Sequence, residues 1–215
     1  MTKTVLQNRI QTDVQVKPAS TSSTHRIGIL GGTFNPPHIG HLMMADQVYQ
    51  QLGLEKIIFI PDAQPPHIDR KETLAVQDRV EMVQRAILDH PQFELGLMEV
   101  QRGGISYTCD TLQQLHQAHP ENQYYLIIGG DMVNYLPKWH QIEKIVQLAQ
   151  LVGVCRKGYE KRSTYPLIWV NMPTSDVSST WIRQTVQTGG SIRYFVPEAV
   201  RQYIQEKGLY LKDEH

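Results

Sequence analysis

Two histidines, His38 and His41, stand three positions apart within ten residues of a glycine pair, Gly31-Gly32, and this combination suits the handling of phosphate groups. Gly31 and Gly32 have no side chains, so their backbone amides can approach an anion closely. Helical periodicity runs from His41 to Leu52, and the first turn of such a helix offers free N–H groups and a positive dipole end to a phosphate. Two imidazoles on one helical face can donate to the same phosphate chain. The segment therefore predicts nucleotide chemistry.

The glycine pair does not belong to the two commonest phosphate-binding fingerprints. No Gly-Lys-Ser/Thr follows it, as a Walker A loop requires, and the chain has no Gly-x-Gly-x-x-Gly motif. A Gly-Gly turn, the Pro36-Pro37 pair or one histidine is ordinary when taken alone. Their joint occurrence after the apolar run Ile27–Leu30 is much rarer. With its His-x-Gly-His motif, the segment resembles the nucleotidylyltransferase superfamily.

A second candidate site lies near the C-terminus, where hydroxyl residues precede an arginine. Ser178, Ser179 and Thr180 are typical of a helix N-cap, which is usually a structural feature. Arg183 follows in the predicted helix Ser179–Gln187, where its planar guanidinium could donate to a triphosphate. The segment resembles the Ser-Ser/Thr-x-Ile-Arg motif that completes the ATP site in the same superfamily. The resemblance implies that both segments line one triphosphate.

The middle of the chain resembles the bacterial nicotinate-mononucleotide adenylyltransferases, and this resemblance covers about residues 26–210. It is carried by Pro65-Pro66-His67, by Tyr107–Leu112, and by Ile128–Asp131 together with Trp139. An indole offers a flat surface to a pyridine ring, worth roughly 1–3 kcal/mol by analogy with base stacking. The resemblance implies that Trp139 stacks on the nicotinate ring. The residues implied to bind nicotinate mononucleotide are Asn35, His67, Tyr107, Thr108 and Trp139.

The same resemblance implies a set of catalytic and ATP-binding residues. His38, His41 and Arg183 are expected to be catalytic. Asp131 is implied at the ribose and magnesium side of the site, although its position after a strand also suits a helix cap. Mg²⁺ is the implied cofactor, held mainly by the ATP phosphates and not directly by the protein. The residues expected at ATP are Gly31, Gly32, Thr33, Phe34, His38, Gly40, His41, Gly129, Asp131, Ser178, Ser179, Thr180 and Arg183.

The implied reaction is attack by the 5′-phosphate of nicotinate mononucleotide on the α-phosphorus of ATP. It releases pyrophosphate and forms deamido-NAD (nicotinate adenine dinucleotide), a step of NAD biosynthesis. The nucleophile is already ionised near neutral pH, so the protein chiefly positions two anions and neutralises charge on phosphoryl oxygens. His41 is the first candidate for this role.

Two positions depart from the family pattern. Asn35 stands where the Gly-Gly-x-Phe-Asp-Pro segment usually has aspartate, and Ile68 replaces the lysine common after Pro-Pro-His. Arg70 or Lys71 could supply the missing charge from a slightly different position.

Other functions stay open. The acceptor could instead be nicotinamide mononucleotide or phosphopantetheine, and the two departures leave room for a nucleotide-binding regulator without turnover. Pyrophosphate release with ATP, Mg²⁺ and a mononucleotide would distinguish an enzyme from such a regulator. A nucleic-acid-binding module is disfavoured by the formal net charge of 0 and the absence of a basic run.

The composition is that of an ordinary globular enzyme. The chain has 215 residues, 40% of them hydrophobic, and no apolar run approaches the roughly 20 residues that span a bilayer. Cys109 and Cys155 lack metal-ligand spacing and are typical of small buried residues. The composition therefore predicts a cytoplasmic protein that binds neither nucleic acid nor membrane, and the resemblance implies ATP and nicotinate mononucleotide as its partners. A homo-oligomer stays open.

Short apolar runs alternate with helical patterns and predict the fold. Continuous apolar strands separated by helices indicate an α/β protein with a doubly wound, mostly parallel sheet and closing C-terminal helices. The resemblance implies the Rossmann-like nucleotidylyltransferase form of that fold. The predicted strands are Ile27–Leu30, Lys56–Ile60, Phe93–Leu97, Tyr124–Gly129, Leu151–Val154 and Leu167–Val170. The first predicted helix begins near His41. The other predicted helices are Val76–His90, Thr111–His119, Gln141–Ala149, Ser179–Gln187 and Pro197–Glu206.

The chain divides into three parts by composition. Residues 1–25 are predicted to be a flexible polar extension, residues 26–210 the nucleotidylyltransferase domain, and residues 211–215 a tail. In an open α/β sheet, ligands bind beyond the carboxyl ends of the strands, where the strand order reverses. The motifs named above follow predicted strands, as this rule requires.

Overall fold

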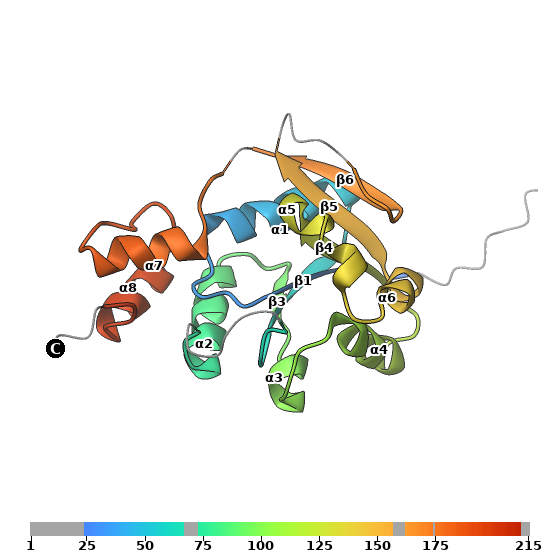
Figure 1. Ribbon diagram of the computed structural model, residues 1–215, viewed down its shortest axis with the longest axis horizontal. Helices are drawn as coiled ribbons and strands as arrows, with labels where there is room; N and C mark the ends of the chain where they lie inside the picture. Colours follow the sequence, from blue (N-terminus) through green and yellow to red (C-terminus); the bar gives the residue numbers. More distant parts are fainter. Residues whose placement is uncertain (1–23, 67–72, 157–161, 174, 212–215) are drawn as a thin grey trace, which may run out of the picture.

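Six parallel strands form one sheet in the part of the chain that the computed structural model describes, residues 24–66, 73–156, 162–173 and 175–211 (Figure 1). The strand order is β3-β2-β1-β4-β5-β6. Every pairing is parallel, which confirms the predicted doubly wound α/β fold. The bounds are β1 Arg26–Gly32, β2 Lys56–Pro61, β3 Phe93–Leu95, β4 Gln123–Gly129, β5 Gln150–Arg156 and β6 Leu167–Met172.

Helices connect the strands and close the chain. The sequence did not predict three short helical segments, because such short segments show no helical periodicity. They are α3 (Met98–Arg102), α5 (Gly130–Val133) and a 3-10 helix at Leu136–Lys138. The bounds are α1 Ile39–Leu52, α2 Val76–Ile87, α3 Met98–Arg102, α4 Thr108–Ala118, α5 Gly130–Val133, α6 Ile142–Leu148, α7 Ser179–Gln187 and α8 Glu198–Glu206.

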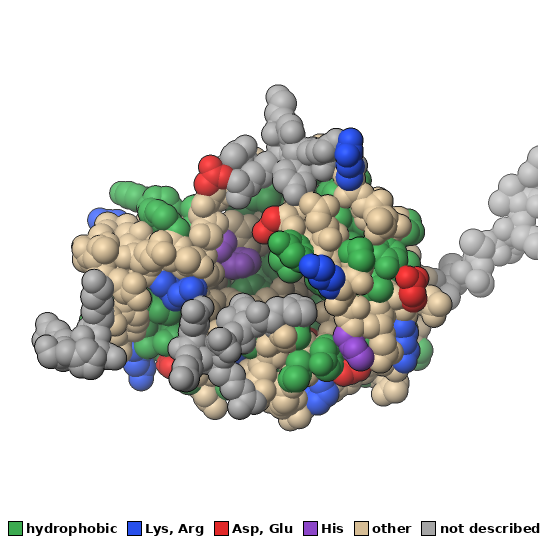
Figure 2. Space-filling model, in the orientation of Figure 1, with side chains coloured by type: hydrophobic (Ala, Val, Ile, Leu, Met, Phe, Trp, Pro, Cys, Tyr) green, Lys and Arg blue, Asp and Glu red, His purple; other side chains and the backbone are tan. Residues whose placement is uncertain are grey.

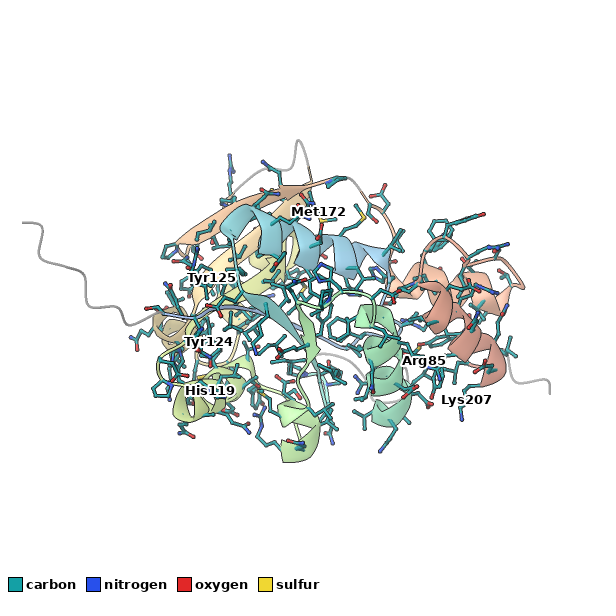
Figure 3. All side chains as sticks on the ribbon, turned by 180° about the vertical axis from the view of Figure 1, so that it is seen from behind. Arg85, His119, Tyr124, Tyr125, Met172 and Lys207 are labelled. Carbon is teal, nitrogen blue, oxygen red and sulfur yellow. The ribbon has the colours of Figure 1, made fainter. Side chains whose placement is uncertain are left out.

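The sheet is buried on both faces, which explains its continuous apolar strands. Successive side chains of a strand point to opposite faces. On β4, Tyr125 and Ile127 join the core beneath α1 and α2, whereas Tyr124 and Leu126 join the core beneath α4 and α6. Figure 3 shows the side chains filling both layers, with Tyr124 and Tyr125 labelled.

A third apolar cluster attaches the C-terminal helices to the sheet domain. Met82 of α2 packs in it with Ile182 of α7 and Val200 of α8. The Ile39 N–H donates to the Phe195 carbonyl at 3.0 Å, so the segment between α7 and α8 also contacts the first residue of α1. Figure 1 shows α7 and α8 beside α2 and the start of α1.

The strand order reverses between β1 and β4. The chain runs outward from β1 to β2 and β3 and then returns to place β4 on the other side of β1. The carboxyl ends of β1 and β4 therefore flank the crevice where ligands of such sheets bind. Gly31 and Gly32 end β1, and Gly129 ends β4.

Candidate active site

Both histidines of the His-x-Gly-His motif lie in the first turn of α1. The helix begins at Ile39, with His38 as its N-cap, which is two residues earlier than the sequence predicts. The ring centroids of His38 and His41 are 3.8 Å apart. Both imidazoles therefore stand at the positive end of a helix that follows the central strand.

The hydrogen bonding of His41 defines its tautomer. The backbone N–H of His38 donates to His41 Nδ1 at 3.2 Å, so this nitrogen carries no proton. Burial, and secondarily the neighbouring His38, hold the pKa of His41 well below its usual value. His41 is therefore a neutral imidazole whose proton is on Nε2. Such a group can donate to a phosphate oxygen without carrying a charge itself.

His38 has an unused ring nitrogen. Burial lowers the pKa of His38 to about 4. Among the described residues, His38 Nδ1 and Ser175 Oγ are buried atoms without a hydrogen-bond partner. A Cβ at Gly40 would lie 3.0 Å from His38 Nδ1 and 3.7 Å from Ser175 Oγ. Gly40 thus avoids a close contact with the His38 ring, and both unpaired atoms lie beside this glycine, where a hydrogen-bonding partner would satisfy them. Ser175 was not predicted, because a lone serine has no sequence signal.

The two glycines after β1 have different surroundings. A Cβ at Gly31 would meet nothing within 4 Å, so the end of the strand faces open space. A Cβ at Gly32 would lie 3.2 Å from the Phe34 ring. Phe34 is 2% exposed and meets the His41 ring edge-on at a centroid distance of 5.1 Å. The structure places Phe34 in the core, where it supports His41.

The C-terminal motif packs on the loop that carries the histidines. Ser179 Oγ donates to the Pro36 carbonyl at 2.8 Å, and Arg183 Nη1 donates to the Asn35 carbonyl at 3.0 Å. Ser178 Oγ caps α7 by accepting from the Trp181 N–H. The two motifs, about 140 residues apart in sequence, are therefore in direct contact. Figure 2 shows the surface hollowed between the C-terminal helices and the sheet domain, with a histidine side chain on the wall.

Three predicted side chains are engaged within the protein. Thr33 Oγ1 donates to Asp62 Oδ2 at 2.7 Å, and Thr180 Oγ1 accepts from Arg183 Nη2 at 3.4 Å. Asn35 is 4% exposed, and its Oδ1 accepts from the Tyr210 hydroxyl at 2.8 Å. Asn35, predicted to bind the mononucleotide, therefore lies in a buried contact with the C-terminal turn.

The end of β4 supplies the opposite side of the crevice. Asp131 lies in the first turn of α5 and is exposed. A Cβ at Gly129 would stand 2.8 Å from Asp131 Oδ1, so glycine makes room for this carboxylate.

Aromatic residues gather at the start of α4 and after α5. Tyr107 is the N-cap of α4, Thr108 is its first residue, and the Tyr107 ring lies 4.4 Å from that of His140. Trp139 Nε1 is buried without a partner among the described residues. A cavity of about 290 Å³ is lined by Met132, Tyr135, Lys138 and Trp139. This surface suits a flat ring. His140 was not predicted.

Several predicted features lie outside the described residues. These are the N-terminal extension up to residue 23, His67, and the Ile68, Arg70 and Lys71 positions beside it. Among the residues that are described, no group of three His, Cys, Asp or Glu side chains could hold a metal ion. None of the described helices is long and apolar enough to cross a membrane.

A larger cavity, about 580 Å³, lies at the opposite ends of the strands. Its charged rim is internally paired, with His25 on Glu55 and Lys56 on Glu94, each at 2.8 Å. It lacks the glycine-rich turn and the helix start of the crevice, and ligands of such sheets bind at the carboxyl ends. We therefore assign the active site to the crevice.

Three features together define a nucleotidylyltransferase. They are the parallel sheet with this strand order, the His-x-Gly-His turn where the strand order reverses, and the Ser-Ser-Thr-x-Ile-Arg segment that packs on that turn. The family model for cytidylyltransferase-like proteins matches residues 29–185. The chain belongs to this family and, within it, to the nicotinate-nucleotide adenylyltransferases of bacteria.

Curated relatives match the chain over nearly its whole length. A protein of Lactiplantibacillus plantarum named "Probable nicotinate-nucleotide adenylyltransferase" is 53% identical over 96% of this chain and 98% of its own length. One of the same name from Enterococcus faecalis is 49% identical over 92% of this chain and 90% of its own. Among solved structures, a Plasmodium falciparum nicotinic acid mononucleotide adenylyltransferase complexed with NaAD has a TM-score of 0.74. It shares 20% identity over 86% of this chain and 97% of its own, so it supports the fold alone.

Proposed function

We propose that this chain transfers the adenylyl group of ATP to nicotinate mononucleotide, forming deamido-NAD and pyrophosphate. The observation that carries the proposal is the direct contact between the two motifs. Arg183 contacts the loop that carries His38 and His41, at the place where the strand order of the sheet reverses. The names of the bacterial relatives support this choice of substrates.

The phosphates of ATP bind at the start of α1. The free N–H groups of its first turn and the amides near Gly31 and Gly32 attract an anion. His41 donates from Nε2 to a phosphoryl oxygen, because its Nδ1 is occupied by the His38 N–H. His38 Nδ1 and Ser175 Oγ face the bare side of Gly40 and bind a further polar atom of the nucleotide. These groups act by orienting the triphosphate and by stabilising charge in the transition state.

The acceptor binds on the other side of the crevice. Its pyridine ring stacks on Trp139, and the start of α4 at Tyr107 and Thr108 supplies free backbone N–H groups near it. The acceptor phosphate attacks the α-phosphorus of ATP in line, the bond to the bridging oxygen of pyrophosphate breaks, and no covalent enzyme intermediate forms. His67 completes this side in the proposal by resemblance alone.

Mg²⁺ enters with ATP in this proposal. The phosphate oxygens hold the ion in this proposal, and Asp131 is the acidic group at the end of β4 on that side of the crevice. When bound, the ion neutralises charge on the triphosphate.

The proposal is tested by incubating the chain with Mg-ATP and nicotinate mononucleotide. Pyrophosphate should appear in equal amount to a dinucleotide with the mass of deamido-NAD. Pyrophosphate without this product would indicate another acceptor. ATP binding without any pyrophosphate, with every acceptor tried, would indicate a regulator that has kept the fold.

A further inference from the structure

The buried polar side chains form a connected network between the two halves of the site. Among the described residues, seven polar or charged side chains are buried, and five of them belong to this network. It begins at the loop after β1 and ends in the first turn of α4. We call these five residues the polar belt: Asp62, Arg79, Glu99, Ser106 and Thr111.

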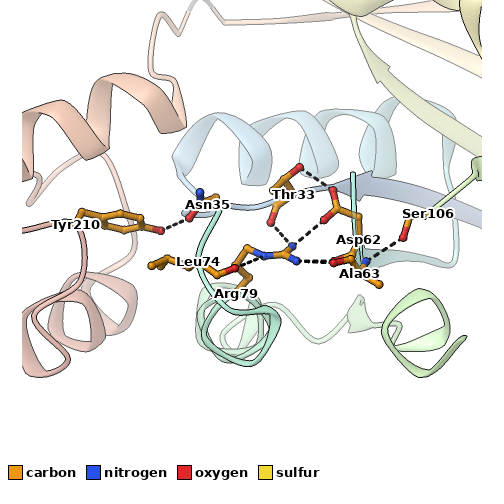
Figure 4. A network of polar contacts seen from close by, with 8 residues as sticks. All are labelled: Thr33, Asn35, Asp62, Ala63, Leu74, Arg79, Ser106 and Tyr210. Atoms are coloured by element: carbon orange, nitrogen blue, oxygen red, sulfur yellow. Dashed lines mark hydrogen bonds and ion pairs between the residues drawn. The ribbon is translucent and has the colours of Figure 1, made fainter. Parts of the chain in front are cut away.

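Arg79 joins the ends of β1 and β2. Its side chain is 1% exposed, and its guanidinium reaches main-chain and side-chain acceptors (Figure 4). Nη1 donates to the Thr33 carbonyl at 2.8 Å and to Asp62 Oδ1 at 2.9 Å, while Nη2 donates to the Asp62 carbonyl at 2.8 Å. Nε donates to the Leu74 carbonyl at 3.3 Å. A planar fork with five donors can make these contacts together, which lysine cannot.

The belt continues from the end of β2 to α4. The Ala63 N–H donates to Ser106 Oγ at 2.9 Å, as Figure 4 shows, and the Ser106 N–H donates to the Gln64 carbonyl at 2.9 Å. The Ser106 side chain also hydrogen-bonds Glu99, whose carboxylate accepts from Thr111 Oγ1 at 2.6 Å. Ser106 directly precedes the N-cap of α4. The belt therefore ends where the acceptor is proposed to bind.

Such a network is costly in stability, and this points to another purpose. Burial of charged groups carries a desolvation penalty, and replacing a buried ion pair by apolar residues is often neutral or stabilising. Burial raises the pKa of both Asp62 and Glu99, which is the mark of that penalty. A fully satisfied network does, however, select one arrangement of the segments that it joins.

We infer that the polar belt fixes the spacing between the phosphate-binding loop and the start of α4, with Arg79 as its principal positioning residue. The inference rests on the proposed function, because it assigns the two ends of the belt to ATP and to the acceptor. In-line transfer needs the attacking oxygen and the phosphorus in near contact, so a small change in this spacing lowers the rate of the bound complex. Binding of either substrate alone depends much less on the spacing.

The test is Arg79→Lys, which keeps the positive charge beside Asp62 and removes the fork. We expect kcat to fall about 10-fold or more, with both KM values within about 3-fold of wild type. Binding of a non-hydrolysable ATP analogue alone should be unchanged. Arg85→Lys is the matched control on the same helix, because Arg85 pairs with Glu81 on the surface. Figure 3 shows Arg85 near Lys207, on the side of α2 that meets α8. The control should keep wild-type kcat.

Thr111→Val is the second variant, in case Arg79→Lys does not fold. It removes the hydroxyl donor to Glu99 at nearly constant volume and lies on α4, away from Arg79. We expect this variant to lower kcat while KM changes little. The fall in kcat of the double variant should be smaller than the product of the two single falls, because both substitutions interrupt one network. A folded Arg79→Lys or Thr111→Val with kcat within 2-fold of wild type would overturn the inference. So would a loss of kcat that only follows the loss of folded protein in circular dichroism.

The outcome stays separable from that of the proposed function. Whether the wild-type chain makes deamido-NAD decides the proposed function alone. The ratio of variant to wild-type kcat, measured with whichever acceptor the wild-type chain adenylylates, decides the role of the belt.

Discussion

At the scale of single residues, the site depends on which nitrogen of each histidine is free. His41 receives the His38 N–H at Nδ1 and so presents Nε2 as a donor, whereas His38 keeps an unpaired Nδ1. Both pKa values are lowered by burial, so both rings are neutral at pH 7. The two histidines are therefore neutral hydrogen-bonding groups rather than permanent positive charges, and the tautomer of His41 is set by its bond from the His38 N–H.

His41→Ala should lower kcat roughly 10²–10⁴-fold, the range for loss of one group that stabilises the transition state. The fold should be intact, because His41 contributes little to the core beyond its contact with Phe34. Steady-state kinetics and binding of an ATP analogue measure the two effects separately. A variant that still binds ATP and turns over at nearly the full rate would disprove the role of His41.

His38 should make stability depend on pH between 6.5 and 4. Its pKa is 6.5 in the unfolded chain and about 4 in the folded one, so within this window only the unfolded state takes up the proton. The free energy of unfolding should therefore fall on acidification, by about 3 kcal/mol at most from this residue. Urea unfolding of wild type and His38→Gln at pH 7, 5.5 and 4.5 measures it. His41, Asp62 and Glu99 are present in both proteins, so parallel curves would contradict the assignment of this pH dependence to His38.

At the scale of elements, the start of α1 is shaped by the absence of a side chain at Gly40. Alanine is about 1 kcal/mol more favourable than glycine inside a helix, so the glycine lowers helix stability. A Cβ would come 3.0 Å from His38 Nδ1 and Cε1, and glycine avoids this contact. Glycine at this position therefore keeps the His38 ring in place at the expense of some helix stability.

Gly40→Ala should lower kcat/KM about 10-fold or more by displacing the His38 ring, while the free energy of unfolding stays within about 1 kcal/mol of wild type. Gln50→Ala, on the exposed side of the same helix, is the control and should leave both quantities near their wild-type values. Kinetics with varied Mg-ATP at saturating mononucleotide gives kcat/KM for ATP, and urea unfolding gives the stability. Full activity in Gly40→Ala would show that the space beside His38 is not needed by the nucleotide.

The sequence predicts the strands and helices that have long hydrophobic patterns, and it does not predict the shortest helical segments. The apolar runs of β1, β2 and β4 and the periodicity of α2 predict their elements, because burial on both faces of a sheet imposes such patterns. The helix of four residues at Gly130–Val133 and the 3-10 turn after it leave no pattern to read.

The site was predictable only where it follows a motif. Glycine, histidine and arginine at fixed spacings pointed to the phosphate side of the crevice. Ser175, His140 and Arg79 were not found, because each is defined by what surrounds it in space, and a lone residue of these types is common on any surface. Asn35 was expected to bind the acceptor mononucleotide, whereas its side chain accepts a hydrogen bond from the Tyr210 hydroxyl, which is 175 residues away in sequence.

At the scale of the whole molecule, the C-terminal helices hold the catalytic loop from outside the sheet. Arg183 and Ser179 bind the carbonyls of Asn35 and Pro36, and the Tyr210 hydroxyl binds Asn35 Oδ1. Burial raises the pKa of Tyr210 above its usual value, so the hydroxyl is protonated and donates at neutral pH. The end of the chain is therefore part of the framework of the site.

Tyr210→Phe should lower the free energy of unfolding by about 0.5–1.5 kcal/mol, because the hydrogen bond from the Tyr210 hydroxyl to the buried Asn35 amide oxygen is lost. Tyr194→Phe is the control, since Tyr194 is 78% exposed, and it should change stability by less than about 0.5 kcal/mol. Urea denaturation followed by fluorescence gives both values. Equal stability of the two variants would show that the contact with Asn35 does not hold the loop.

Adenylyl transfer to the acid form of the pyridine mononucleotide is the reaction that the crevice is proposed to carry out. The most direct measurement compares kcat/KM for nicotinate and nicotinamide mononucleotide with Mg-ATP, following pyrophosphate and identifying each dinucleotide by mass. We predict a strong preference for the acid, with deamido-NAD as product and His41→Ala nearly inactive. Equal or reversed preference would contradict the assignment of the acceptor while leaving adenylyl transfer in place, and no pyrophosphate with either mononucleotide would contradict the account of the site itself.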